Sequence, residues 1–203
     1  MIKIKSLCLN HPPHRYFNLA LQNNLMIDIY TFVEAVWLMW PAYGANGLCI
    51  LAKGKRPIDG NRTWRGKPIL GQGKTWEGFA LGVIVGALVG ALQMFAYPFL
   101  PWDLSPVKLD IVQMTPLIGA LLGAGAMFGD MVGSFIKRRI GIPRGRPAPL
   151  LDQLDFIFGM FLFLSFVHPL KWEWVVILVI ITPVIHLTAN FIAYLLKLKD
   201  VPY

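Results

Sequence analysis

The chain is poor in charged residues and in cysteine. Only 15% of its 203 residues are Asp, Glu, Lys or Arg, whereas soluble domains carry about 25%. Hydrophobic residues make up 56% of the chain, and the mean hydropathy is +0.56. The two cysteines, Cys8 and Cys49, have no CxxC spacing and no histidine cluster around them, so a disulfide or zinc site has little support. The composition excludes an ordinary soluble domain and indicates a single integral membrane domain over residues 1–203.

The N-terminal segment also lacks a feature, because it holds no apolar run long enough for the core of a signal peptide. We therefore expect residues 1–25 to form a loose extension. Met26 stands just before the first long apolar stretch, and we expect the functional chain to begin near it.

Five apolar stretches stand out along the rest of the chain. A helix that crosses a bilayer needs about 20 mostly apolar residues. The stretches lie near residues 27–52, 75–97, 111–136, 150–167 and 174–196. The fourth is short, so we expect it to be tilted or to begin in a polar funnel. The predicted fold class is an all-α polytopic membrane protein with five transmembrane helices.

Lysine and arginine are concentrated in two of the connections. Residues 53–74 hold seven of them and residues 137–152 hold five, whereas residues 98–110 and 168–173 hold one each. Cation-rich loops remain in the cytoplasm according to the positive-inside rule. We therefore predict two long basic cytoplasmic loops in a multi-pass cell-membrane protein, with the C-terminus in the cytoplasm and the N-terminus outside.

Glycines recur at intervals of four residues in two of the predicted spans. Small residues at this spacing let helices approach closely. We expect them to pack the second span on the third, or to form the seam of a homodimer. The glycines are Gly78, Gly82, Gly86 and Gly90 in one span, and Gly119, Gly123, Gly125, Gly129 and Gly133 in the other.

Three aspartates lie where the apolar pattern meets the second basic loop. A charge in hydrocarbon costs roughly 3 kcal/mol, so an acid inside a span indicates a functional site. Asp130 lies in the apolar part of the third span, while Asp152 and Asp155 share a face at the start of the fourth. Hard oxygen ligands from two helices suit Mg²⁺, and two such ions can clamp a phosphoryl centre. Two alternatives stay open. Asp152 could serve only to stabilise the N-terminus of its helix, where aspartate is favoured by capping and by the helix dipole. Asp130 could form a structural ion pair with a lysine or arginine.

Polar side chains follow Asp130 along one helix face. Ser134, Lys137 and Arg138 stand four, seven and eight residues after it, and Arg139 comes next. The face therefore offers a carboxylate, a hydroxyl and cations that run toward the cytoplasmic side. Topology alone could also explain the cations, because positive loops are normal on that side.

A second candidate segment, Gly71-Gln72-Gly73-Lys74-Thr75, leads into the second span. It resembles the tail of a P-loop, but Pro68 stands where that pattern requires glycine, and no βαβ unit surrounds it. Glycine amides, a lysine and a threonine at a helix N-terminus can still form an anion site. The alternative is a flexible hairpin capped by Thr75.

Several segments together resemble a known family. Two separated loops and the third and fourth spans are similar to the archaeal CDP-archaeol synthase family, a relative of the phosphatidate cytidylyltransferases. The loop at residues 142–147 departs from the phosphatidate cytidylyltransferases, because it has no K-D or H-G-G, and Gln153 replaces the Arg of D-R-x-D. The matching segments are Arg56-Pro57-Ile58-Asp59-Gly60, Gly73-Lys74-Thr75-Trp76-x-Gly78, Ser134-Phe135-Ile136-Lys137-Arg138-Arg139 and Leu151-Asp152-Gln153-Leu154-Asp155.

The resemblance implies a membrane cytidylyltransferase of phospholipid biosynthesis. Such an enzyme joins CTP to 2,3-bis-O-geranylgeranylglycerol 1-phosphate and releases pyrophosphate, among membrane lipids. It implies that Asp130, Asp152 and Asp155 hold Mg²⁺, as two ions, and that Lys137 joins them in catalysis. The expected substrate-binding residues are Asn46, Lys67, Gly71, Gly73, Lys74, Thr75, Ser134, Arg138 and Arg139.

Other functions remain open from the residues. A phosphatidate cytidylyltransferase would act on a diacyl lipid instead. A lipid-binding or transport protein would have no enzymatic activity, and the absence of a visible inverted repeat argues against a transporter. No recognised nucleic-acid-binding module is present, so we expect no nucleic-acid partner.

Overall fold

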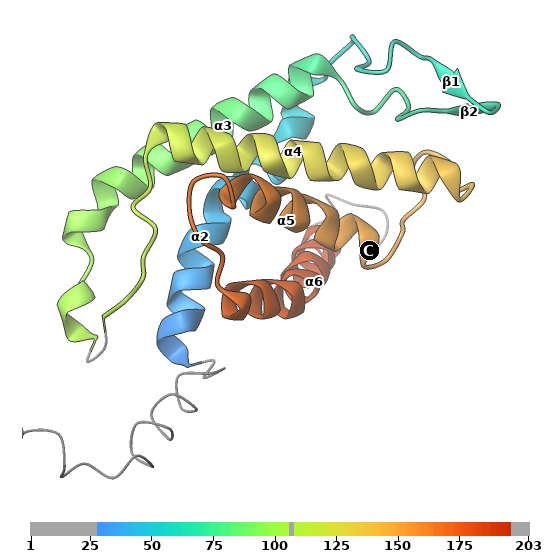
Figure 1. The fold of residues 1–203 in the computed structure, drawn as a ribbon. Helices are drawn as coiled ribbons and strands as arrows, with labels where there is room; N and C mark the ends of the chain where they lie inside the picture. The colour runs from blue at the N-terminus through green and yellow to red at the C-terminus, as the bar shows by residue number, and fades with distance from the viewer. Residues whose placement is uncertain (1–27, 106–107, 196–203) are drawn as a thin grey trace, which may run out of the picture.

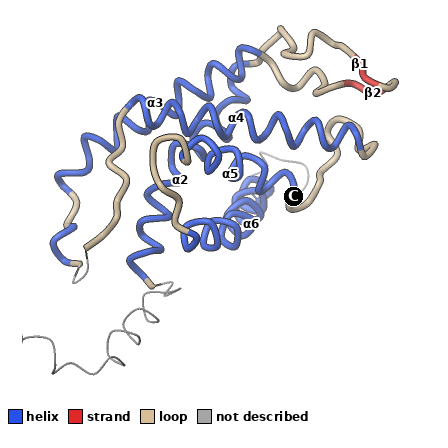
Figure 2. The backbone as a smooth tube through the Cα atoms, viewed as in Figure 1, coloured by secondary structure: helices blue, strands red, loops and turns tan. Residues whose placement is uncertain are grey.

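The computed structural model describes residues 28–105 and 108–195, and the predicted extension at residues 1–25 lies outside them. The described chain is built almost wholly of α-helices with one small hairpin (Figures 1 and 2). The helices are α2 (Ile29–Leu48), α3 (Trp76–Ala96), α4 (Pro116–Arg139), α5 (Leu151–Leu164) and α6 (Trp172–Leu195). Short 3₁₀ turns are η1 (Cys49–Ala52), η2 (Tyr97–Phe99) and η3 (Trp102–Leu104), and the strands are β1 (Thr63–Trp64) and β2 (Lys67–Pro68).

The helices differ in their ability to cross a membrane. Three helical segments are long and apolar enough, namely Ile29–Ala52, Trp76–Phe99 and Pro116–Arg139. Helix α5 has only 14 residues, which is about 21 Å. Helix α6 has 24 residues, and the part of it that the structure describes in full includes the apolar segment Trp172–Thr188. The prediction of an all-α membrane body is confirmed, whereas five complete spans are not.

Side-chain caps determine where three helices begin. Asp28, Thr75 and Thr115 precede α2, α3 and α4, and each accepts the backbone N–H three residues further on, at 2.8, 3.2 and 3.1 Å. Proline suits the first position of a helix because its missing N–H has no helical partner there. Helix α4 therefore starts at Pro116, five residues later than the predicted span.

The glycine stripes pack helices within one chain. A Cβ on Gly86 of α3 would lie 2.4 Å from the carbonyl oxygen of Gly119 in α4. On another face of α4, a Cβ on Gly159 of α5 would lie 2.1 Å from the carbonyl oxygen of Gly125. Only glycine permits such close approach. The prediction that the second span packs on the third is confirmed, and Figure 1 shows α3 and α4 side by side.

The connections gather at two ends of the bundle. The hairpin from the α2–α3 loop lies against the C-terminal end of α4, where Lys67 donates to the Arg139 carbonyl at 3.0 Å. At the other end, buried Glu34 of α2 accepts from the Asp110 N–H at 2.6 Å, and from Lys171 and Trp174 at 2.9 Å. The two cation-rich loops therefore share one end of the molecule.

Candidate active site

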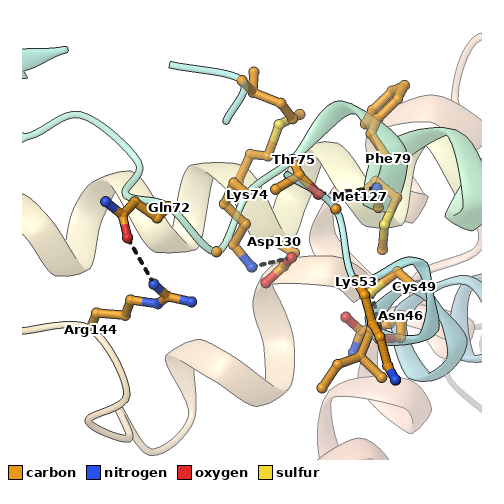
Figure 3. Close-up of a pocket in the computed structure, with 16 residues that line it drawn as sticks. Asn46, Cys49, Lys53, Gln72, Lys74, Thr75, Phe79, Met127, Asp130 and Arg144 are labelled. Carbon is orange, nitrogen blue, oxygen red and sulfur yellow. Dashed lines mark hydrogen bonds and ion pairs between the residues drawn. The ribbon is translucent and has the colours of Figure 1, made fainter. Parts of the chain in front are cut away.

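A cavity of about 410 Å³ lies at the cation-rich end (Figure 3). The α2 helix, the α2–α3 loop, α3 and α4 contribute to its wall. The polar lining includes Asn46, Lys53, Lys74, Thr75, Asp130 and Arg144. The apolar lining includes Ile50, Phe79, Met127 and Met131. A cavity with both kinds of wall can hold a molecule that has a charged head and an apolar tail.

Lys74 and Asp130 form an ion pair inside this cavity. Figure 3 shows the two side chains pointing toward each other, one from the α2–α3 loop and one from α4. About a quarter of each side chain is exposed, at 23% and 24%. The contact joins the predicted anion-binding segment to the predicted carboxylate face, so two motifs far apart in the sequence meet at one site.

Asp152 forms a second ion pair, with Lys137. The Lys137 Nζ lies 2.6 Å from Asp152 Oδ1, and this pair links α4 to the first turn of α5. The other carboxylate oxygen of Asp152 accepts the N–H of Ala148 at 2.9 Å, which holds the α4–α5 loop against the helix start. Two residues that were predicted separately as catalytic, Lys137 and Asp152, are therefore in contact and neutralise each other.

Asp155 is buried and lies between α4 and α5. Its side chain covers Gly133, where a Cβ would lie 2.0 Å from Asp155 Oδ2. Its other oxygen accepts the N–H of Phe156 at 2.6 Å. Within the described part of the chain, no cationic side chain lies within ion-pair distance of Asp155, although the charges of Asp130, Asp152 and Lys74 act on it.

The three aspartates do not assemble as a ready metal centre. Among residues 28–105 and 108–195, no group of three or more His, Cys, Asp or Glu side chains is placed to hold a metal ion. Asp130 and Asp152 each pair with a lysine instead. The donor set nevertheless fits Mg²⁺ in its chemistry, because it consists of carboxylate oxygens and includes one buried acid with no cation beside it.

A second cavity, of about 470 Å³, adjoins the first and shares Gln72 and Arg144 with it. Lys67, Gly71 and Arg138 line this second cavity. Arg144 donates to Gln72 at 3.3 Å, which places this contact where the two cavities meet. Cations therefore continue from the first cavity into the second.

Asp59 organises the segment between the cavities. It accepts the N–H groups of Leu70 and Gly71, both at 2.9 Å, and that of Asn61 at 3.0 Å. Burial opposes the charge of Asp59, but the N–H groups of Gly71, Leu70 and Asn61 together hold its pKa below the usual 3.8. The sequence predicts a Gly71 N–H that is free for a phosphate, whereas in the structure this group is bound to Asp59.

Three other predicted binding residues have structural partners. Arg139 donates to the carbonyls of Trp64, Lys67 and Pro68 and stacks on the Trp64 ring. Arg138 is buried and donates to Ile142 O at 2.6 Å. The Thr75 hydroxyl caps α3 and lines the first cavity.

The remaining predicted residues divide between the cavities and the core. Asn46 and Gly73 line the first cavity, and Lys67 lines the second. Ser134 is buried in α4, outside the lining of both. These binding roles all stay predictions.

Sequence reasoning missed several polar residues that line the cavities, among them Lys53, Asp59, Gln72 and Arg144. Asp59 stood inside one of the matching segments, and Arg144 stood in the loop where the pattern departs from the phosphatidate cytidylyltransferases. Their presence in cation-rich, glycine-rich loops was the available signal. It did not distinguish them from the other loop residues.

The structure combines a bundle of apolar helices with two adjoining cavities that have carboxylate, lysine and arginine side chains in or near their walls. This combination is typical of a membrane enzyme that acts on phosphate groups. The family model described as "CarS-like: CDP-archaeol synthase" matches residues 26–203. The chain is 46% identical to the CDP-archaeol synthase of Thermococcus gammatolerans over 173 residues, which are 83% of this chain and 95% of the relative. It is 40% identical to that of Methanocaldococcus jannaschii over 171 residues, 82% and 94% of the two chains.

A solved structure is also similar. It is described as "Structural insight into an intramembrane enzyme for archaeal membrane lipids biosynthesis", and it matches with a TM-score of 0.67 and 36% identity. The match covers 78% of this chain and 94% of that one. The chain belongs to the CDP-archaeol synthase family and is a membrane enzyme of the cytidylyltransferase class.

Proposed function

We propose that the chain transfers CMP from CTP to 2,3-bis-O-geranylgeranylglycerol 1-phosphate, giving the CDP-lipid and pyrophosphate. The observation that carries this proposal is the Lys74–Asp130 ion pair within a cavity that has both polar and apolar walls. It brings a segment of the phosphate-binding type next to a carboxylate inside a membrane helix. The names of the relatives, CDP-archaeol synthase, agree with this reaction.

The chemistry needs positioning and charge neutralisation more than an activated nucleophile. An oxygen of the lipid phosphate attacks the α-phosphorus of CTP, and the bond to the β-phosphate oxygen breaks as pyrophosphate leaves. The attacking phosphate is already anionic, so no general base has to take a proton from it. Catalysis of such transfers comes mainly from fixed positive groups around the phosphates. Lys74, Arg138 and Arg144 supply such groups in the walls of the two cavities, and Lys137 supplies one beside Asp152.

Asp130, Asp152 and Asp155 would hold Mg²⁺, as two ions. Bound there, the metal would neutralise charge on the phosphates. The buried Asp155, which has no cation beside it within the described chain, supports this assignment. Lys74 and Thr75 would contact the nucleotide phosphates, and Asn46 and Lys53 would line the same cavity.

The lipid would enter sideways from the bilayer. Ile50 lines the first cavity and is also 77% exposed, so apolar surface continues from the cavity to the outside of the bundle. The basic end would face the cytoplasm according to the positive-inside rule. Helices α5 and α6 would complete a five-helix membrane domain, and a reporter fused to the C-terminus should be active only in the cytoplasm.

The test uses radiolabelled CTP and purified full-length protein with either the isoprenoid ether phosphate or diacyl phosphatidate. We expect labelled CDP-lipid from the ether lipid and loss of the product in EDTA. Asp152→Asn and Asp155→Asn should each abolish turnover, while Asp110→Asn, a carboxylate at the opposite end, should not. Turnover of diacyl phosphatidate alone would reassign the substrate, and full activity of the Asp152 and Asp155 variants would overturn the metal assignment.

A further inference from the structure

Two of the three proposed metal-binding carboxylates are paired with a lysine. Lys74 reaches Asp130 from the α2–α3 loop, and Lys137 reaches Asp152 from α4. The two lysines come from different elements and pair with different aspartates, so a single local contact does not explain both. Asp155, the most buried of the three acids, has no such partner among the described residues.

The membrane environment explains why such pairs would be needed before substrates bind. A buried carboxylate without a counterion is costly, and more so at the depth of a bilayer. A lysine provides that counterion as a single charge on a flexible four-carbon stem, which can move to another anion without rearranging the backbone. Only 15% of the Lys137 side chain and 23% of the Lys74 side chain are exposed, so solvent screens these pairs only partly.

We propose that Lys74 and Lys137 are placeholder cations, which neutralise Asp130 and Asp152 in the resting enzyme and pass to the nucleotide phosphates when metal and CTP bind together. The inference rests on the proposed function, because it requires those carboxylates to be metal ligands. It adds an energetic coupling. A metal ion that binds without CTP must displace the ammonium group of a lysine, which is then left without an anion. CTP that binds without metal brings its phosphates beside the negative charge of Asp155, which no cation neutralises.

The coupling has a measurable consequence. Each ligand should strengthen the binding of the other by the same factor, because linkage is reciprocal. We expect Mn²⁺, used as a spectroscopic substitute for Mg²⁺, to bind at least about tenfold more tightly to the wild-type protein when saturating CTP is present. Electron paramagnetic resonance titration of Mn²⁺ on full-length protein in nanodiscs measures this directly, without turnover, because the lipid substrate is left out.

Variants of single lysines then show whether Lys74 and Lys137 cause this coupling between metal and CTP. Lys74→Gln and Lys137→Gln should each raise the affinity for Mn²⁺ alone about tenfold and reduce the effect of CTP. Lys53→Gln is the matched control, because Lys53 lines the same cavity and has no ion pair among the described residues. It removes the same charge without freeing a carboxylate, so it should change the affinity for Mn²⁺ by less than about threefold.

The outcomes separate the two proposals. If Asp130→Asn and Asp152→Asn leave Mn²⁺ binding unchanged, the proposed function loses its metal site. If those variants weaken Mn²⁺ binding but Lys74→Gln behaves like Lys53→Gln, only the placeholder inference fails. Wild-type protein that binds Mn²⁺ equally well with and without CTP also overturns the inference, and that measurement does not depend on the folding of any variant.

Discussion

Replacing Gly133 by alanine tests whether the position of Asp155 matters for turnover. A Cβ at Gly133 would lie 2.0 Å from Asp155 Oδ2, 2.8 Å from its Cγ and 2.9 Å from its Cβ. Ordinary contact begins near 3.4 Å, so the Asp155 carboxylate must move by roughly 1.4 Å. A displacement of about 1 Å in a catalytic site can cost about 100-fold in rate. We therefore expect kcat to fall by roughly 100-fold, which corresponds to about 2.7 kcal/mol of activation free energy.

Two glycine variants control for the insertion of a methyl group. Gly47 lies in α2, and a Cβ there would have nothing within 4 Å, so Gly47→Ala should keep full activity. Gly86→Ala would clash with the carbonyl of Gly119 at 2.4 Å, and Gly119 lies far along α4 from Gly133, the glycine beside Asp155. It should lower the free energy of unfolding by about 1–3 kcal/mol through overpacking, while the folded fraction keeps its kcat.

The assay is steady-state release of pyrophosphate, with thermal unfolding in detergent measured on the same samples. A folded Gly133→Ala protein with the kcat of the wild type would refute the reasoning, because Asp155 would then tolerate displacement. A loss of kcat equal to that of Gly86→Ala would also refute it, since the effect would then come from packing alone.

Three other predictions concern the loops and the opposite end of the bundle. Arg139→Lys should release the hairpin, because lysine cannot stack flat on Trp64 while donating to several carbonyls. The free energy that docks the hairpin should fall by about 1 kcal/mol, and faster trypsin cleavage in the hairpin would measure this loss. Asp59→Asn should raise the KM for CTP several-fold with kcat unchanged. Folding lowers the pKa of Asp59. The stability that its charge adds is therefore present above the unfolded pKa of 3.8 and is lost as pH falls through the lower folded value. Between about pH 5 and 8 Asp59 keeps its charge, so it should cause no change in the KM of the wild type across that range. Glu34→Gln should lower the free energy of unfolding by at most about 3 kcal/mol. Lys171, which pairs with Glu34, is one-third exposed, so water can solvate its charge when the carboxylate is removed. A lower unfolding midpoint with unchanged kcat would confirm this.

The helices and the aspartate face could be predicted because their causes are local. Thr75 caps α3 through its own hydroxyl, and the spacing of the glycines in α3 and α4 encodes their close packing. Asp130 stood out because an acid inside an apolar helix is rare. Each of these signals lies within a short stretch of sequence.

The pairings between distant segments could not be predicted in the same way. Lys74 and Asp130 are 56 residues apart, and no spacing rule connects them. Arg139 is expected at a phosphate from the family resemblance, and the structure adds a contact that no pattern indicated. It docks a hairpin whose turn places both Arg65 and Gly66 at positive φ. The end of α5 at Leu164 was missed because the apolar pattern continues after the helix stops.

Helix α4 explains how a small bundle assembles a site from distant segments. Gly119 and Gly123 bring α3 against one face of α4, and α3 positions the loop that carries Lys74. Gly129 and Gly133 bring α5 against another face, where a Cβ on Gly129 would lie 2.1 Å from the carbonyl oxygen of Asp155. Asp130 stands seven residues, about two turns, after Gly123, so it continues the face of α4 that meets α3. The packing that holds the bundle together therefore also sets the distances among its charged groups, and the two glycines beside Asp155 should affect turnover through geometry even though they touch no substrate.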